Sequence, residues 1–229
     1  EGSRERARVV RTYYDGYQHR VYGFTPNGSI VSGGANGQLT IYNKDGEELA
    51  KLVGHEGTVW ALAVEGDRLL SGSDDQTLKL WDLGEVDGFE PKVDWDWLRK
   101  KSKVASEQTG EKWSAQDVKQ HYDSKKQSHK YLTKLVIEPT VSLFVSFEKG
   151  SNPPEPSGWV AWTKSGYYAS SLNGDRLIGF HVNRGSEKSA RFYDSSRFYE
   201  SLYKPELVRQ AFLLGSEDKA IAKLKETRR

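Results

Sequence analysis

Two pieces of sequence decide the fold of this chain: Gly54-His55, and the run Ser71-Gly72-Ser73-Asp74-Asp75-Gln76-Thr77-Leu78-Lys79-Leu80-Trp81-Asp82. Apolar and polar residues alternate between Thr77 and Leu80, which is the period of a β-strand with one buried face. Turn-forming residues separate this strand from two further apolar runs, at residues 59–64 and 68–71. The two pieces therefore predict a unit of short strands joined by tight turns.

An earlier copy of the same pattern precedes this unit. Ser32 to Asn43 superposes without gaps on Ser71 to Asp82, at an offset of 39 residues. This spacing is close to the roughly 40–45 residues that make one blade of a β-propeller. Residues 49–52 fit the outer strand of the earlier copy, and residues 9–14 fit the last strand of a unit before it.

The second copy opens on Gly-His and closes on Trp-Asp, after an Asp-x-Thr-apolar-Lys-apolar-Trp run. In these features it resembles a blade of the WD-repeat β-propellers. The resemblance implies a mostly β fold of WD-repeat blades, here joined to a helical insertion and a helical C-terminal tail. The sequence holds three blade-like units, whereas a closed propeller has about four to eight blades. We therefore expect an incomplete ring that belongs to a longer protein.

The resemblance also assigns a hydrogen-bonded tetrad to the second copy: His55, Ser71, Asp75 and Trp81. Such bonds satisfy polar groups that would each cost about 1–3 kcal/mol if they were buried without a partner. A Ser-His-Asp hydrolase is the competing interpretation, but no Gly-x-Ser-x-Gly turn surrounds the serine. We therefore expect a structural tetrad and no catalytic residue. The first copy has other residues at these positions, so its tetrad is degraded: Tyr17, Ser32, Asn36 and Tyr42.

A third β-rich segment, residues 136–183, lacks both Gly-His and Trp-Asp. Its apolar runs and the hairpin signal at Asn173-Gly174 predict four strands, enough for a closing blade. The segment reads Gly158-Trp159-Val160-Ala161-Trp162-Thr163-x-x-Gly166-Tyr167-Tyr168, then Gly174-Asp175-x-Leu177-Ile178-Gly179-Phe180-His181-Val182. From Gly158 to about Ala220 the chain is similar to bacterial WD-repeat proteins, many of which carry a caspase-like peptidase domain. This chain contains no cysteine, so the nucleophile of such a peptidase is absent from it.

Residues 84–135 form a non-repetitive insertion between the second and third β units. Trp95 and Trp97 lie near its start, and residues 98–134 then carry ten basic against four acidic side chains. Two helices with excess positive charge are compatible with a reader of nucleic acid. The alternative interpretation is a solvated helical hairpin inserted between blade strands, or a docking arm for an acidic partner.

Helices are predicted in the insertion and in the tail, residues 184–229. In the insertion we expect one helix over 97–108 and a second from the capping box at Ser114 to about residue 127. In the tail, Pro205 and Gly215 mark the ends of one helix, and another follows Ser216. Aromatic and leucine side chains of the tail are expected to pack against the propeller: Phe192, Tyr193, Phe198, Tyr199, Tyr203, Phe212, Leu213 and Leu214.

Composition excludes several classes of protein. The 229 residues include no cysteine and five histidines without metal-ligand spacing, and no phosphate-binding loop appears. We therefore expect no cofactor and no metal. No apolar run reaches the ~20 residues of a membrane span, and no charged-then-apolar leader begins the sequence. We expect a cytoplasmic protein with no membrane contact, and a net charge of +2 argues against extensive coating of nucleic acid.

Taken together, the sequence predicts a non-catalytic scaffold or sensor that binds a protein partner and regulates an effector, with a caspase-like protease as the candidate. The division expected is residues 1–83 for two blades, 84–135 for the insertion, 136–183 for the closing blade and 184–229 for the helical cap. The competing function is nucleic-acid binding through the basic insertion. The candidate contact residues are Tyr22, Trp60, Trp95, Trp97, Lys100, Lys101, Lys125 and Lys126.

Overall fold

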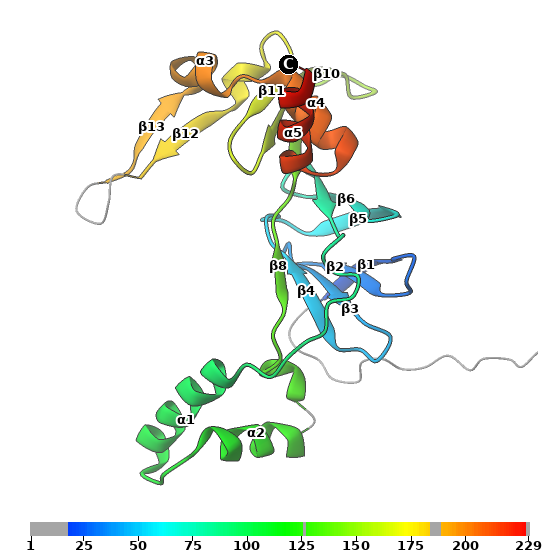
Figure 1. Cartoon of the computed structure of the whole chain (residues 1–229). Helices are drawn as coiled ribbons and strands as arrows, with labels where there is room; N and C mark the ends of the chain where they lie inside the picture. The colour runs from blue at the N-terminus through cyan, green and yellow to red at the C-terminus, as the bar shows by residue number, and fades with distance from the viewer. Residues whose placement is uncertain (1–17, 126, 184–188, 228–229) are drawn as a thin grey trace, which may run out of the picture.

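The computed structural model describes residues 18–125, 127–183 and 189–227. Figure 1 shows two β-sheets in the middle of the molecule, the helical insertion at one end and the C-terminal helices at the other. In these described ranges the strands form separate sheets and no closed propeller ring. The strand predicted at residues 9–14 lies outside the described residues.

The first sheet contains the first predicted blade. Its strands β1 (His19–Phe24), β2 (Ile30–Gly34), β3 (Leu39–Tyr42) and β4 (Glu48–Leu52) pair antiparallel in chain order. The predicted outer strand at residues 49–52 is therefore confirmed as β4. A short strand that follows the insertion, β8 (Leu135–Ile137), adds to β4 in parallel. The insertion thus leaves the second blade and returns beside the first.

The second sheet has the order β5-β6-β7-β9-β10-β11. The strands β5 (Val59–Glu65), β6 (Arg68–Ser73) and β7 (Thr77–Asp82) confirm the three strands predicted for the second repeat. The fourth position is taken by β9 (Val141–Phe147), which pairs antiparallel with β7 although the insertion separates the two in sequence. The second blade therefore receives its outer strand from beyond the insertion.

Two further strands extend this sheet, β10 (Pro156–Thr163) and β11 (Tyr168–Ser170). The predicted closing segment therefore does not build a sheet of its own. The hairpin predicted at Asn173-Gly174 is also wrong, because a 3₁₀ turn, η2 (Gly174–Leu177), follows instead. A Cβ at Gly174 would lie 1.9 Å from the Trp159 carbonyl oxygen, so this glycine permits a close backbone approach. The next strand, β12 (Gly179–Val182), pairs with β13 (Arg191–Asp194).

The two faces of the second sheet are covered differently. One face packs on the first sheet around a core of fully buried side chains, among them Val31, Leu39, Leu52, Leu69 and Trp81. On the other face, Leu80, Val141, Ala161 and Ala169 pack against Val208, Ala211 and Ala220 of the two tail helices. The second blade is thus held between the first blade and the C-terminal tail.

The tail helices α4 (Pro205–Leu214) and α5 (Glu217–Thr227) confirm the predicted ends at Pro205 and Gly215. They follow two short turns, η3 (Ser195–Phe198) and α3 (Tyr199–Leu202). The predicted packing of the tail side chains is confirmed only in part. Phe198 contacts Phe180, and Tyr203 contacts Tyr168. Phe212 and Leu213 are exposed because α4 turns only one side to the sheet, and Phe192 on β13 and Tyr199 on α3 are exposed as well.

The insertion folds as a helical hairpin with a small core of its own. Its helices are α1 (Trp95–Thr109) and α2 (Ala115–Ser124), followed by η1 (Ser128–Lys130). The predicted capping box at Ser114 is present, although α2 ends three residues earlier than expected. Leu98, Val118 and Tyr131 form the buried centre of this unit.

Candidate functional site

The four tetrad residues meet in one chain of hydrogen bonds. Trp81 donates its indole N–H to Ser71 Oγ at 2.8 Å, and the same oxygen lies 2.7 Å from His55 Nε2. On the other side of the ring, His55 Nδ1 lies 2.7 Å from Asp75 Oδ2. Because an ionised carboxylate only accepts, Nδ1 carries the ring proton and Nε2 accepts the proton of the Ser71 hydroxyl.

Electrostatics favour this arrangement of protons. Burial alone would raise the pKa of Asp75, but hydrogen bonds from Thr77, His55 and the backbone N–H of Glu56 lower it to about 2. Burial lowers the pKa of His55, and its bond to Asp75 offsets this only in part. At neutral pH the network therefore consists of an ionised aspartate and a neutral histidine.

The position of the network explains what it does. Ser71 lies on β6, Trp81 on β7 and Asp75 in the turn between these strands, while His55 lies in the link that enters the second blade. His55 and Ser71 are buried, and Trp81 has no exposed surface. A substrate would have to unfold the blade to reach the Ser71 hydroxyl. The network therefore fastens the link between blades to the strands of the second blade.

The first blade holds a different histidine contact, which the sequence alignment missed. His19 on β1 shares a hydrogen bond with the Ser32 hydroxyl, and its ring lies near Tyr42. Asn36 aligns with Asp75 and forms the same turn. Its side chain accepts from the backbone N–H of Gln38, as the Asp75 side chain accepts from that of Thr77. Tyr17 lies outside the described residues. Because His19 is on the strand rather than in the preceding link, an ungapped alignment gives no signal for it.

An exposed aromatic cluster lies on β1 and β5, the first strands of the two blades, which would be the inner strands of a propeller. Tyr22 and Phe24 on β1 make an edge-to-face contact, and Arg20 on the same strand lies over the ring of Trp60 on β5 at 5.5 Å. Trp60 also donates its indole N–H to Asp74 at 2.7 Å. Tyr22 is 72% exposed and Trp60 is 54% exposed. We call Arg20, Tyr22, Phe24 and Trp60 the inner-strand cluster.

The two tryptophans of the insertion have different surroundings. Trp95 at the start of α1 is exposed. Trp97 is half-buried in the small core, where its ring centroid lies 5.4 Å from that of Tyr122 and 5.5 Å from Lys101 Nζ. Trp97 therefore contributes to the fold of the insertion, whereas Lys101 is exposed beside its ring and Trp95 is the exposed tryptophan.

The remaining basic candidates are dispersed. Lys100 on α1 and Lys125 after α2 are exposed, and Lys126 lies outside the described residues. Part of the positive charge is paired inside the insertion, since Lys119 Nζ lies 2.7 Å from Asp123. The structure does not gather the predicted lysines into one compact basic site with the inner-strand cluster.

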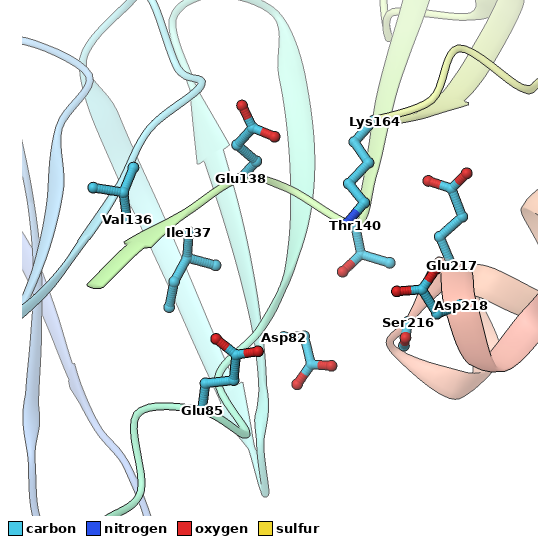
Figure 2. Close-up of a pocket in the computed structure, with 10 residues that line it drawn as sticks. All are labelled: Asp82, Glu85, Val136, Ile137, Glu138, Thr140, Lys164, Ser216, Glu217 and Asp218. Carbon is cyan, nitrogen blue, oxygen red and sulfur yellow. The ribbon is translucent and has the colours of Figure 1, made fainter. Parts of the chain in front are cut away.

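An acidic pocket that the sequence did not indicate lies where the second blade meets the tail. Figure 2 shows Asp82 and Glu85 on one side, Glu217 and Asp218 of α5 on the other, and Lys164 extending between them. The cavity measures about 410 Å³. Its residues come from four separate segments of the chain, so no local sequence motif predicts the pocket.

The described part of the chain has neither a metal-binding cluster nor a membrane-spanning helix. No group of three or more His, Cys, Asp or Glu side chains is placed there to hold a metal ion. None of the described helices combines the length and the apolar character needed to cross a membrane.

Comparison with known families and proteins agrees with the fold of the second blade. The family described as "WD domain, G-beta repeat" matches residues 46–82. This span starts before β4 and ends with β7, so it includes all four tetrad positions. The chain therefore carries a WD repeat.

Several known proteins are similar to this chain over short stretches. Mitochondrial division protein 1 of Mycosarcoma maydis is 35% identical over 69 residues, which cover 30% of this chain and 8% of that protein. WD repeat-containing protein 1 of Xenopus tropicalis is 42% identical over 67 residues, covering 26% of this chain and 11% of that protein. Each match thus spans only a small part of the relative. These relatives are eukaryotic, and together with the family match they support a WD-repeat protein.

A solved structure of a computationally designed protein, Ika8, is 35% identical over 27% of this chain and 20% of that chain, with a TM-score of 0.26. Overlap of this extent adds nothing to the description of the fold.

Proposed function

We propose that this protein is a non-catalytic interaction scaffold that recognises a protein partner through the inner-strand cluster. The observation that carries the proposal is the exposure of three aromatic rings beside an arginine, on two neighbouring strands of different sheets. Aromatic and arginine side chains are enriched at the energetic centres of protein interfaces. The WD-repeat relatives support the same class of function.

The Trp60 side chain of the cluster is held by contacts within the protein. The bond from Trp60 to Asp74 and the contact of Arg20 with the Trp60 ring fix the orientation of the indole. A side chain that is already held in place loses less conformational entropy on binding. This preorganisation distinguishes the cluster from isolated exposed apolar residues, which are common on protein surfaces.

The non-catalytic part of the proposal rests on the tetrad. The Ser71 hydroxyl donates to His55 and accepts from Trp81, so its proton is already used inside the blade. A hydrolase would need this oxygen exposed beside an oxyanion-binding group.

A caspase-like protease is the effector that this scaffold would regulate. The sequence resemblance from Gly158 to about Ala220 supports this part, and the eukaryotic relatives do not bear on it. With no cysteine in the chain, the protease would be supplied by another segment or another polypeptide. A cytoplasmic location stays a prediction from sequence.

Site-specific photocrosslinking tests the proposal. A photoreactive phenylalanine analogue replaces Tyr22 in one variant and Phe147, an exposed residue on β9, in a matched control. We expect one defined crosslinked protein from a lysate of the source cells at position 22 and its loss when Trp60→Ala is added. The proposal would be contradicted if position 147 gave as much of the same crosslinked product. It would also be contradicted if adding Trp60→Ala left the crosslinking at position 22 unchanged.

Nucleic-acid binding through the insertion is the second candidate. It is favoured by the exposed basic side chains of α1: Arg99, Lys100, Lys101 and Lys103. Phosphate contacts make affinity fall steeply with salt. Fluorescence anisotropy with labelled single- and double-stranded oligonucleotides at 50 and 200 mM salt would show this dependence, and Lys100→Ala with Lys101→Ala would reduce its slope. Nucleic-acid binding through the insertion would be excluded if no binding were found at 50 mM salt, or if the double variant bound as the unmodified protein does.

A further inference from the structure

Lys79 is a cation inside the second blade. Its side chain is only 6% exposed and lies on β7, on the face that carries Ser71 and Trp81. Across the next strands, register places Lys79 opposite Ser142 on β9 and Ser142 opposite Trp162 on β10. Lys79 Nζ donates to Ser142 Oγ at 3.1 Å and lies 5.6 Å from the centre of the Trp162 ring.

These contacts leave the ammonium group incompletely satisfied. An ammonium has three N–H donors, and within the described residues Ser142 is the acceptor that Lys79 reaches. The ion pairs found among those residues do not include Lys79. The Trp162 ring faces the cation but offers no lone pair to the remaining donors. Burial lowers the pKa of Lys79, and the carboxylates of Asp75 and Glu56 offset this only in part, without forming an ion pair with it. A buried lysine that has no ion-pair partner is rare in folded proteins.

A cavity of about 240 Å³ adjoins this cation. We call it the Lys79 pocket, and the residues that matter for its chemistry are Val53, Lys79, Glu138, Ser142, Trp162 and Lys164. Its volume is below the roughly 300–1,000 Å³ of pockets for drug-sized ligands, which suits a small group. The free donors of Lys79 and the second cation, Lys164, favour a group with anionic oxygens.

The carboxylate of Glu138 also lines the Lys79 pocket and restricts the charge of its occupant. A phosphate group carries about −1.5 to −2 charges at neutral pH, so Glu138 repels it more than it repels a singly charged carboxylate. Figure 2 shows Glu138 and Lys164 again at the edge of the neighbouring acidic pocket. The charges around the Lys79 pocket therefore favour a carboxylate over a phosphate.

We propose that the Lys79 pocket binds a carboxylate of a partner protein, supplied by an acidic side chain or by a free C-terminus. The carboxylate oxygens accept from Lys79 Nζ, and the indole of Trp162 covers the apolar stem. This inference rests on the proposed role as a protein-interaction scaffold, and it uses a surface distinct from the inner-strand cluster. It identifies the chemistry of a second partner contact as acidic.

Nuclear magnetic resonance of the full chain tests the proposal, with the indole N–H signal of Trp162 as the reporter. The probes are Ac-Gly-Glu-Gly-NH2, its glutamine counterpart Ac-Gly-Gln-Gly-NH2, the free acid Ac-Gly-Gly-Gly-OH, and inorganic phosphate. We expect saturable shifts with the glutamate peptide or the free acid, and affinity about tenfold or more weaker for the glutamine peptide. The stronger of the two acids identifies the source of the carboxylate.

Lys79→Met removes the ammonium and keeps an unbranched apolar side chain, and Lys100→Met in the insertion is the matched control. Binding should disappear in the first variant and persist in the second. Equal affinity for the glutamate and glutamine peptides, tighter binding of phosphate than of either carboxylate, or binding that survives Lys79→Met would overturn the proposal. If Lys79→Met does not fold, the relative affinities of the four probes for the unmodified protein still show whether the pocket prefers a carboxylate.

The two proposals fail separately. Crosslinking from position 22 depends on the inner-strand cluster and does not require the Lys79 pocket. Loss of that crosslinking with intact carboxylate binding would reject the cluster alone, whereas the reverse result would reject the carboxylate site alone.

Discussion

The two blades share a strand pattern but are stabilised by different means. In the first blade Val31, Leu39 and Ile41 are fully buried against the second blade. In the second blade, the residue that aligns with Leu39 is Leu78, which is 43% exposed. That blade instead contains the buried network that ends on Trp81. Both blades have apolar packing, since Leu69 and Trp81 of the second blade belong to the same core. The comparison teaches that this repeat pattern folds with or without the complete polar network.

The largest expected effect is at the centre of the second blade. Trp81→Ala deletes a fully buried indole and removes the donor to Ser71, so we expect a loss of about 3–5 kcal/mol in the free energy of unfolding. Urea denaturation followed by circular dichroism measures it. Trp60→Ala, which changes an exposed indole in the same blade, should cost less than about 1 kcal/mol. Similar losses of unfolding free energy in both variants would show that Trp81 is not the main source of stability in this blade.

A direct comparison of the blades comes from their two serines. Ser71→Ala leaves the buried His55 and Trp81 nitrogens without partners, at a cost of about 2–3 kcal/mol. Ser32→Ala should cost about 1 kcal/mol or less, because His19 is exposed and can bond water instead. Equal changes in the urea midpoint would remove the distinction drawn between the blades.

Acid should weaken the second blade in two steps. The pKa of His55 is lowered by folding, so the unfolded chain takes up a proton first and stability falls as the pH drops below about 6.5. The pKa of Asp75 falls from 3.8 to about 2, so a further loss, on the order of 1–2 kcal/mol, develops below about pH 4. Urea midpoints between pH 7.5 and 3 measure both steps. His55→Gln should remove the upper step, and a midpoint that rises on acidification to pH 5 would contradict the assignment of charges.

The smallest effect is expected at Lys79. Replacing this buried, incompletely paired cation by methionine should leave the unfolding free energy unchanged or raise it by about 1 kcal/mol. A thermal melt of Lys79→Met beside the unmodified protein measures the change. If the free energy of unfolding fell by several kcal/mol, the ammonium would be required for the stability of the blade. Its presence in the pocket would then need no ligand to explain it.

Local patterns predicted the parts of the fold in which neighbours in sequence are neighbours in space. The strands from Val59 to Asp82, the capping box at Ser114 and the helix between Pro205 and Gly215 are all of this kind. The alternative of a helical hairpin inserted between blade strands agrees with the pairing of β7 with β9. The sequence did not identify β9 as the partner strand, because the insertion separates the two strands and no local pattern links them.

The same distinction between local and long-range features applies to the sites. The tetrad was assigned from a repeat motif, and its four side chains do meet in the structure. The acidic pocket and the Lys79 pocket bring together side chains from segments far apart in sequence, such as Lys79 and Trp162. Lys79 itself reads in the sequence as the polar residue of an alternating strand, and only the added strands β9 and β10 bury it.

The most direct test of the account compares Ser71→Ala with Trp60→Ala in the photocrosslinking experiment, at a temperature where both variants are folded. If the tetrad supports the fold and the inner-strand cluster binds the partner, Ser71→Ala keeps the crosslinked product per folded molecule and Trp60→Ala loses it. The opposite pattern, with the product lost in Ser71→Ala and kept in Trp60→Ala, would contradict the account.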